Sequence, residues 1–127
     1  MLLPRNKFDD EAVERLALLS EKELLPLADE LLTWLQDMNW PIAPAVAELL
    51  MPHIAAIEFP IIKIFSSNDD IWKRWVINCL LEPAPVSSIT PRLRQALYRI
   101  ATLPTPGEVD DELDQAAREF LDYLAEA

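Results

Sequence analysis

The sequence of 127 residues contains one glycine, one cysteine and one histidine. Sheet hairpins and phosphate-binding loops use glycine at turns with positive φ, so the single Gly107 argues against β-rich and nucleotide-binding folds. The lone Cys79 cannot form an internal disulfide, and the lone His53 excludes metal sites built from several histidines. Long apolar runs and a signal-peptide pattern are also lacking, so we expect a cytoplasmic protein that does not enter a membrane.

Proline, by contrast, is abundant, with eleven residues, and 51% of the sequence is hydrophobic. Proline is tolerated in the first turn of a helix, and a helix usually ends before a proline that follows it. This combination is therefore typical of short helices bounded by prolines. The length is that of one domain with a core of its own. We therefore predict a single all-α domain over residues 1–127.

Two helix-like apolar patterns meet at Asp37-Met38-Asn39-Trp40-Pro41, in the middle of residues 27–51. Asn39 is a good N-cap and Pro41 suits a first helical turn, so we expect the second helix to begin there. Such a short connection makes the helices antiparallel. The predicted unit is a helical hairpin with Trp40 at its elbow and Trp34 on the apolar stripe of its first helix.

The same pattern recurs along the chain. A short helix is expected over residues 9–19, and a second hairpin has Asp69 and Asp70 at the start of its second helix, whose apolar stripe is Ile71, Trp75, Cys79 and Leu80. A third hairpin follows Pro83, with its last helix from about Glu108. The first two hairpins can be superposed with a shift of about 31 residues, a period that favours a HEAT-like α-solenoid of about three hairpins plus a short N-terminal helix.

Charge is unevenly distributed in this chain of net charge −11. Residues 1–58 carry −7, residues 59–104 carry +3 and residues 105–127 carry −7. Nucleic-acid binding requires many basic groups against phosphates, so we do not expect it. Two interpretations stay open: an ordinary solvated acidic surface, or an acidic face that complements a basic protein partner.

Catalytic and metal-binding patterns are weak. The acidic runs 9–11, 69–70 and 110–112 fit helix starts, where carboxylates interact favourably with the positive end of the helix dipole. Cys79 is expected to be an inert thiol on an apolar stripe, and His53 a residue at a helix end. We expect no cofactor and no metal site.

Tryptophan gives the strongest candidate surface. Four tryptophans, Trp34, Trp40, Trp72 and Trp75, cluster in the first two hairpins. Trp40 and Trp72 are the candidates for partial exposure, and exposed tryptophan is enriched at binding hot spots. The predicted binding residues lie at the two elbows: Asp37, Asn39, Trp40, Asp69, Asp70 and Trp72.

At these residues the chain resembles a known family. The run Trp34-Leu35-Gln36-Asp37-Met38-Asn39-Trp40-Pro41-Ile42-Ala43 and the later run Asn68-Asp69-Asp70-Ile71-Trp72-Lys73 are similar to small, mostly bacterial proteins known as domain of unknown function five thousand and seventy-one. The resemblance extends from Asn6 over nearly the whole chain. It implies a compact HEAT-like helical domain with no established activity. An association of such families with bacterial toxin–immunity systems is sometimes suspected.

Three hypotheses for the function follow. The first is a non-catalytic protein-interaction module whose elbow surface docks a protein partner, for which a basic toxin neutralised by an immunity protein is one example. The alternative is a small enzyme or metal-binding protein that uses the acidic pairs at the elbows. The third is a structural subunit that associates with itself through exposed tryptophan. The sequence leaves the oligomeric state open.

Overall fold

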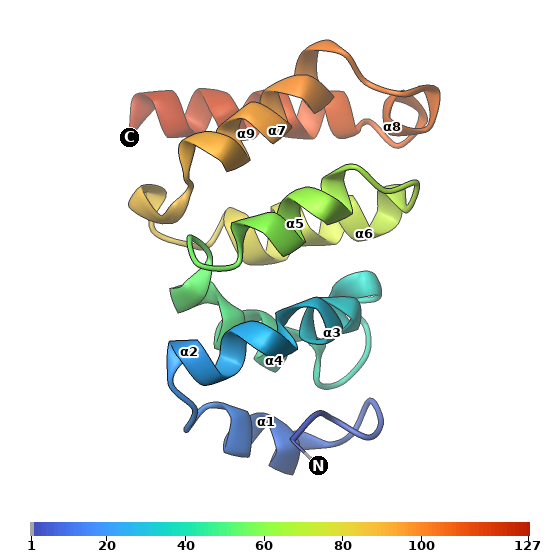
Figure 1. Ribbon diagram of the computed structural model, residues 1–127. Coiled ribbons are helices and arrows are strands. Elements are labelled where there is room, and N and C mark those ends of the chain that lie inside the picture. Colours follow the sequence, from blue (N-terminus) through green and yellow to red (C-terminus); the bar gives the residue numbers. More distant parts are fainter. Residues whose placement is uncertain (1) are drawn as a thin grey trace.

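The computed structural model describes residues 2–127, which form helices and connecting turns without any strand. The all-α prediction is confirmed. Figure 1 shows the helices stacked in chain order, from α1 (Asp10–Leu16) at the bottom to the C-terminal helix at the top. Asp9 caps α1 by accepting a hydrogen bond from the backbone N–H of Ala12. None of the helices in the described part of the chain is both long and apolar enough to cross a membrane.

The first hairpin has two irregular arms. Its first arm begins with a capping box between Ser20 and Glu23, a spacing of serine and glutamate that is typical of helix starts. The arm then runs through α2 (Glu21–Leu24), the 3-10 turn η1 (Leu25–Leu27), α3 (Ala28–Thr33) and the 3-10 turn η2 (Trp34–Gln36). The returning arm consists of α4 (Ala43–Leu50) and the 3-10 turn η3 (Met51–His53).

The predicted start of that returning arm is wrong. The helix begins at Ala43 with Ile42 in the cap position, not at Asn39. The reason is a local turn, in which the Asp37 side chain accepts the backbone N–H of Asn39 and the Asp37 carbonyl accepts that of Trp40. These hydrogen bonds hold the chain in a turn up to Trp40, so the helix can begin only beyond it.

The second hairpin consists of α5 (Glu58–Phe65), α6 (Asp70–Trp75) and η4 (Val76–Leu81). The last segment is a π-helix, in which the backbone N–H of Glu82 bonds to the carbonyl of Ile77 five residues earlier.

The predicted apolar stripe of this hairpin is displaced. Ile71 is 61% exposed, whereas the inward positions are Lys73, Val76, Ile77, Leu80 and Leu81. These five residues have helical spacing, but the first is a lysine, and hydrophobic periodicity alone places a lysine on the outside.

The third hairpin follows the 3-10 turn η5 (Val86–Ser88) and consists of α7 (Pro91–Thr102) and α9 (Leu113–Glu126). Between them lies the short α8 (Pro106–Asp110), which starts with a capping box of Thr105 and Glu108. The predicted last helix from about Glu108 is therefore two helices, separated at Glu112, whose positive φ of 58° interrupts the helical path.

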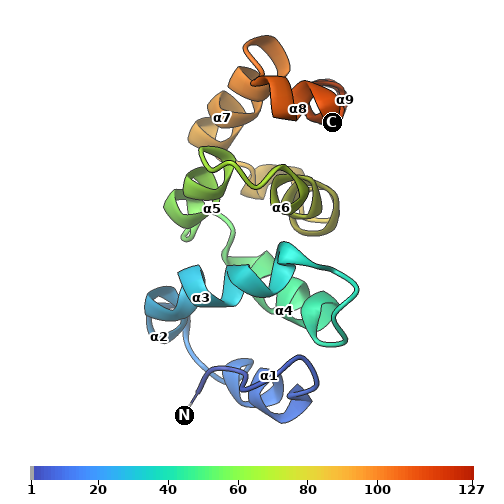
Figure 2. The same ribbon diagram turned by 90° about the vertical axis from the view of Figure 1, so that its right-hand side faces the viewer.

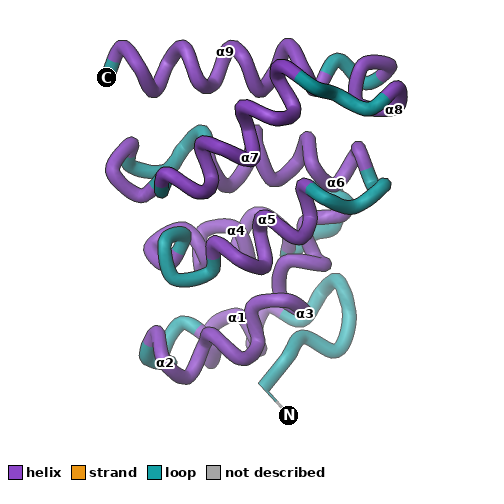
Figure 3. The backbone as a smooth tube through the Cα atoms, turned by 45° about the horizontal axis from the view of Figure 1, so that its top comes forward, coloured by secondary structure: helices purple, strands orange, loops and turns teal. Residues whose placement is uncertain are grey.

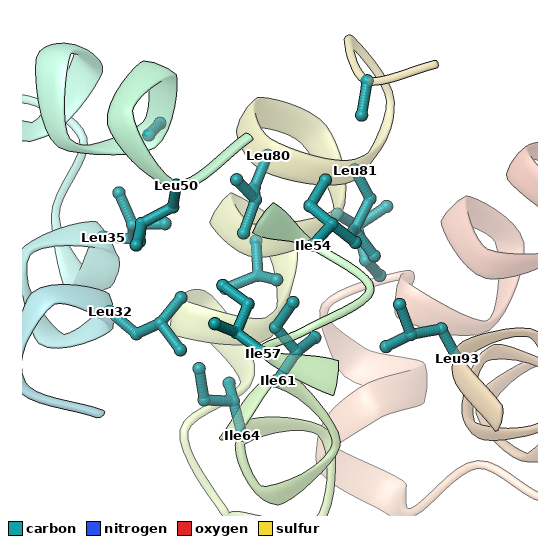
Figure 4. Close-up of a cluster of buried hydrophobic side chains, with 14 of the residues drawn as sticks. Leu32, Leu35, Leu50, Ile54, Ile57, Ile61, Ile64, Leu80, Leu81 and Leu93 are labelled. Carbon is teal, nitrogen blue, oxygen red and sulfur yellow. The ribbon is translucent and has the colours of Figure 1, made fainter. Parts of the chain in front are cut away.

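The hairpins form two columns of helices. Figure 2 shows α3, α5 and α7 on one side and α4, α6 and α9 on the other, and Figure 3 shows the connections between them as short loops. Between the columns lies one continuous apolar core, part of which is drawn in Figure 4, where Leu32, Leu50, Ile61, Leu80 and Leu93 come from successive layers. The chain-order stacking is a property of solenoids. The closer assignment to HEAT repeats stays a prediction.

The turns of the three hairpins lie along one edge of the stack. The turn after η2, the turn between α5 and α6, and α8 are all on the right-hand side of Figure 1. Both predicted elbows, residues 37–42 and 66–69, therefore lie on the same edge of the molecule, together with residues 103–112.

Candidate functional site

The first elbow brings Asp37, Asn39 and Trp40 together. One carboxylate oxygen of Asp37 accepts the backbone N–H of Asn39 at 2.9 Å, and Asn39 itself is exposed. Trp40 is half-buried, which confirms the predicted partial exposure. The carboxylate of Asp37 is thus engaged in shaping the turn.

The Trp40 ring packs against the ring of Trp34. Their centroids are 5.5 Å apart and the ring planes are inclined by 74°, the edge-to-face arrangement that aromatic pairs favour. Trp34 is half-buried at the margin of the core, so its predicted place inside the apolar stripe is only partly correct. Two tryptophans share this elbow, and neither is fully exposed.

At the second elbow Asp69 and Trp72 have structural partners. The carboxylate of Asp69 caps α6 by accepting the backbone N–H of Trp72 at 3.0 Å. The indole N–H of Trp72 donates to the backbone carbonyl of Leu32 in α3, also at 3.0 Å. Trp72 therefore links the first hairpin to the second, and it is half-buried.

Asp70 belongs to a buried ion-pair network. Its carboxylate lies 2.9 Å from Nζ of Lys73, whose side chain is only 2% exposed. The same Nζ lies 2.9 Å from the carboxylate of Glu108, which is fully buried. The carboxylate of Asp70 also lies directly over Gly107, where a Cβ atom would clash with it.

Glu108 is the centre of this network. Arg99 donates to both of its carboxylate oxygens, at 2.5 and 2.9 Å, and the backbone N–H of Thr105 donates at 2.8 Å. Burial by itself would raise the pKa of Glu108, but the hydrogen bonds from Arg99, Thr105 and Lys73 outweigh it and lower the pKa from 4.5 to about 2. The carboxylate stays ionised and saturated with donors.

Sequence reasoning did not find the network residues Lys73, Arg99 and Glu108. A partial signal was present, because Thr105 and Glu108 have the spacing of a capping box. The pairing of Lys73 with Glu108 spans 35 residues and has no local signature.

Each elbow carboxylate has a partner within the fold. Asp37 and Asp69 shape a turn and a helix end, and Asp70 neutralises a lysine. In residues 2–127 no three His, Cys, Asp or Glu side chains are grouped so that they could hold a metal ion. The hypothesis of an enzyme or metal-binding protein that uses these acidic pairs stays a prediction.

A different acidic feature lies between η4 and α9. Glu82, Glu119, Phe120 and Tyr123 line a groove of about 410 Å³, which we call the η4–α9 groove. The rings of Phe120 and Tyr123 are stacked with centroids 6.3 Å apart, and Tyr123 is 52% exposed. Burial, together with the negative charge of Glu119, raises the pKa of Glu82.

Cys79 and His53 have limited chemistry. Cys79 is half-buried, and burial together with the nearby Glu82 raises the pKa of its thiol, so little reactive thiolate forms at neutral pH. Nδ1 of His53 lies 2.9 Å from a carboxylate oxygen of Glu21, a contact that links the two arms of the first hairpin.

Comparison with known families identifies most of the chain. The family model described as "Domain of unknown function (DUF5071)" matches residues 2–121, so the resemblance found at the two tryptophan runs is confirmed. That description names no activity. No curated protein matches the sequence.

Proposed function

We propose that this chain, which belongs to the DUF5071 family, is a non-catalytic module that binds a basic protein partner through the η4–α9 groove. The observation that carries the proposal is the pairing of Glu82 with Glu119 in a groove whose lining includes no basic side chain. The raised pKa of Glu82 reflects first its burial and then the repulsion between its carboxylate and that of Glu119.

A cationic side chain would relieve that repulsion. A lysine or arginine of a partner would meet two carboxylates and the exposed ring of Tyr123, so an ion pair and a cation–π contact would form together. The stacking of Phe120 on Tyr123 holds this ring in place, which lowers the entropy lost on binding. The net charge of −11 would also accelerate association with a basic protein.

This groove replaces the elbows as our preferred contact surface. The elbow carboxylates of Asp37, Asp69 and Asp70 are engaged within the fold, whereas Glu82 and Glu119 make no ion pair with any described residue. Asn39 and Trp40 remain available at the first elbow for peripheral contacts. An immunity-type role, in which the module masks a basic toxin in the bacterial cytoplasm, suits this chemistry.

The test compares capture of a partner by three proteins. Wild type, the double variant Glu82→Gln/Glu119→Gln and the control Glu14→Gln/Glu30→Gln would each be used to retain proteins from a lysate of the native cells. The control removes the same charge from exposed positions outside the groove. We expect wild type and control to retain the same basic protein, and the groove variant to retain at least tenfold less of it.

Two results would count against the proposal. Equal retention by the groove variant would show that the partner binds elsewhere, and equal weakening by both double variants would show that only net charge matters. Raising the salt concentration should weaken capture by wild type, because exposed charge pairs are screened.

A further inference from the structure

We infer that the groove between α5 and α7 is a second docking surface, which accepts an acidic amphipathic helix of a partner protein. This surface lies on the other column of helices from α9 (Figure 2), and its charge is opposite to that of the η4–α9 groove. The inference therefore does not depend on the proposed function.

This groove combines apolar side chains with two arginines. The groove has a volume of about 410 Å³ and lies between two helices of neighbouring hairpins. Its lining residues are Phe59, Ile62, Phe65, Ser66, Arg92, Gln95, Ala96 and Arg99. Phe59 is 61% exposed, so a partner's apolar side chain placed against it would remove aromatic surface from water.

The charged lining residues are both arginines. Arg99 is neutralised by Glu108 and donates a further hydrogen bond to the carbonyl of Phe65, so it forms a fixed part of the groove wall. Arg92 is different, because it makes no ion pair with any residue in the described part of the chain.

The position of Arg92 is nevertheless defined. Its guanidinium lies over the ring of Phe59, 5.0 Å from the ring centroid. This cation–π contact joins α5 to α7 across the mouth of the groove and holds the guanidinium with its N–H donors available. A carboxylate of a partner would complete the coordination that the chain itself leaves open.

The occupant follows from this arrangement. An amphipathic helix satisfies its own backbone hydrogen bonds and can place apolar side chains one turn apart into a groove between two helices. One such side chain would cover Ile62 and Ala96 and displace water from Phe59, and an acidic residue beside it would reach Arg92. A basic helix would instead meet a cation at the mouth of the groove.

The test uses a defined probe. A stapled, fluorescein-labelled helical peptide with leucine at every third or fourth position and glutamate between them would be titrated against the full chain by fluorescence anisotropy. We expect saturable binding, with NMR shifts confined to α5 and α7. Arg92→Gln and Phe59→Ala should each weaken binding at least tenfold, whereas Lys22→Gln, which removes an equal charge from an exposed position on α2, should not.

Several outcomes would overturn the inference. These are the absence of saturable binding, shifts outside α5 and α7, an equal effect of Arg92→Gln and Lys22→Gln, or equally tight binding of the peptide with lysine in place of glutamate. Unchanged melting of the variants would confirm that they fold. Glu119→Gln should leave peptide binding unchanged, which separates this surface from the η4–α9 groove.

Discussion

Nζ of Lys73 lies 2.9 Å from a carboxylate oxygen of Glu108, and neither side chain is more than 2% exposed. The two residues belong to different hairpins, since Lys73 is in α6 and Glu108 is in α8. Nearby, the guanidinium of Arg74 also donates to the backbone carbonyl of Asp111. The second and third hairpins are thus joined by specific polar contacts as well as by the apolar core.

The first prediction concerns the loss of one member of this network. Glu108→Gln should lower the free energy of unfolding by about 3–5 kcal/mol, because it leaves the buried charge of Lys73 without full compensation. Urea unfolding at neutral pH measures the change. The exposed Glu126→Gln is the control and should have little effect. A loss below about 1 kcal/mol for Glu108→Gln would show that the network contributes little.

The second prediction is the pH dependence of the same group. The pKa of Glu108 is about 2 in the folded protein and near 4.5 when unperturbed, so the unfolded state binds more protons between these values. The stabilisation from Glu108 is therefore fully present above about pH 4.5 and is lost as the pH falls towards 2. The difference in stability between wild type and Glu108→Gln should narrow over this range in urea titrations. A constant difference would disagree with the lowered pKa.

The third prediction concerns Glu82, whose negative charge should lower the stability of the fold, whereas that of Glu108 raises it. The pKa of Glu82 is raised in the folded protein, so ionisation of its carboxyl group above that pKa lowers the free energy of unfolding. Glu82→Gln should therefore stabilise the protein at neutral pH, by less than about 1 kcal/mol at this partly exposed site. The gain should disappear in acid, where wild-type Glu82 is also neutral. Thermal melting at pH 7 and pH 4 checks this, and destabilisation at pH 7 would contradict it.

The fourth prediction concerns the tryptophan pair at the first elbow. Since Trp34 and Trp40 are both half-buried and packed edge to face, neither alanine variant should have the full effect of a core truncation. A double-mutant cycle should give a coupling energy of about 0.5–1.5 kcal/mol. Additive effects would show that the two rings do not stabilise each other.

The fifth prediction concerns Gly107. An added methyl group would clash with the Asp70 carboxylate, which the ion pair with Lys73 holds in place, so Gly107→Ala should cost about 1–3 kcal/mol. In the double variant Gly107→Ala/Asp70→Ala the clash is removed. We therefore expect Asp70→Ala to lower the free energy of unfolding less in the Gly107→Ala background than in wild type. Equal losses in the two backgrounds would argue against the clash.

Much of the fold was predictable from local patterns. Asp69 at a helix start, the abundance of proline and the near absence of glycine indicated short helices, and the apolar periodicity placed them in three hairpins after a short first helix. These features depend on residues within one or two helical turns of each other, so sequence spacing is sufficient to reveal them. The predicted start of α4 was wrong because the side chain of Asp37 holds the preceding residues in a turn.

The candidate site was less predictable. The sequence indicated the elbow residues Asp37, Asn39, Trp40, Asp69, Asp70 and Trp72, but it could not show that most of their polar groups are engaged within the fold. Both grooves arise only when separate hairpins pack. Glu82 meets Glu119 across two hairpins, and Phe59 meets Arg92 in the same way.

The sequence by itself therefore determined the helical class and the order of the hairpins. Only the tertiary structure decided that Lys73 points inward, that Ile71 points outward and that Glu108 is buried. The physical reason is that a buried charge is tolerated only when opposite charges and hydrogen-bond donors surround it. For Lys73 the compensating carboxylate of Glu108 comes from a segment 35 residues away, which no local pattern can specify.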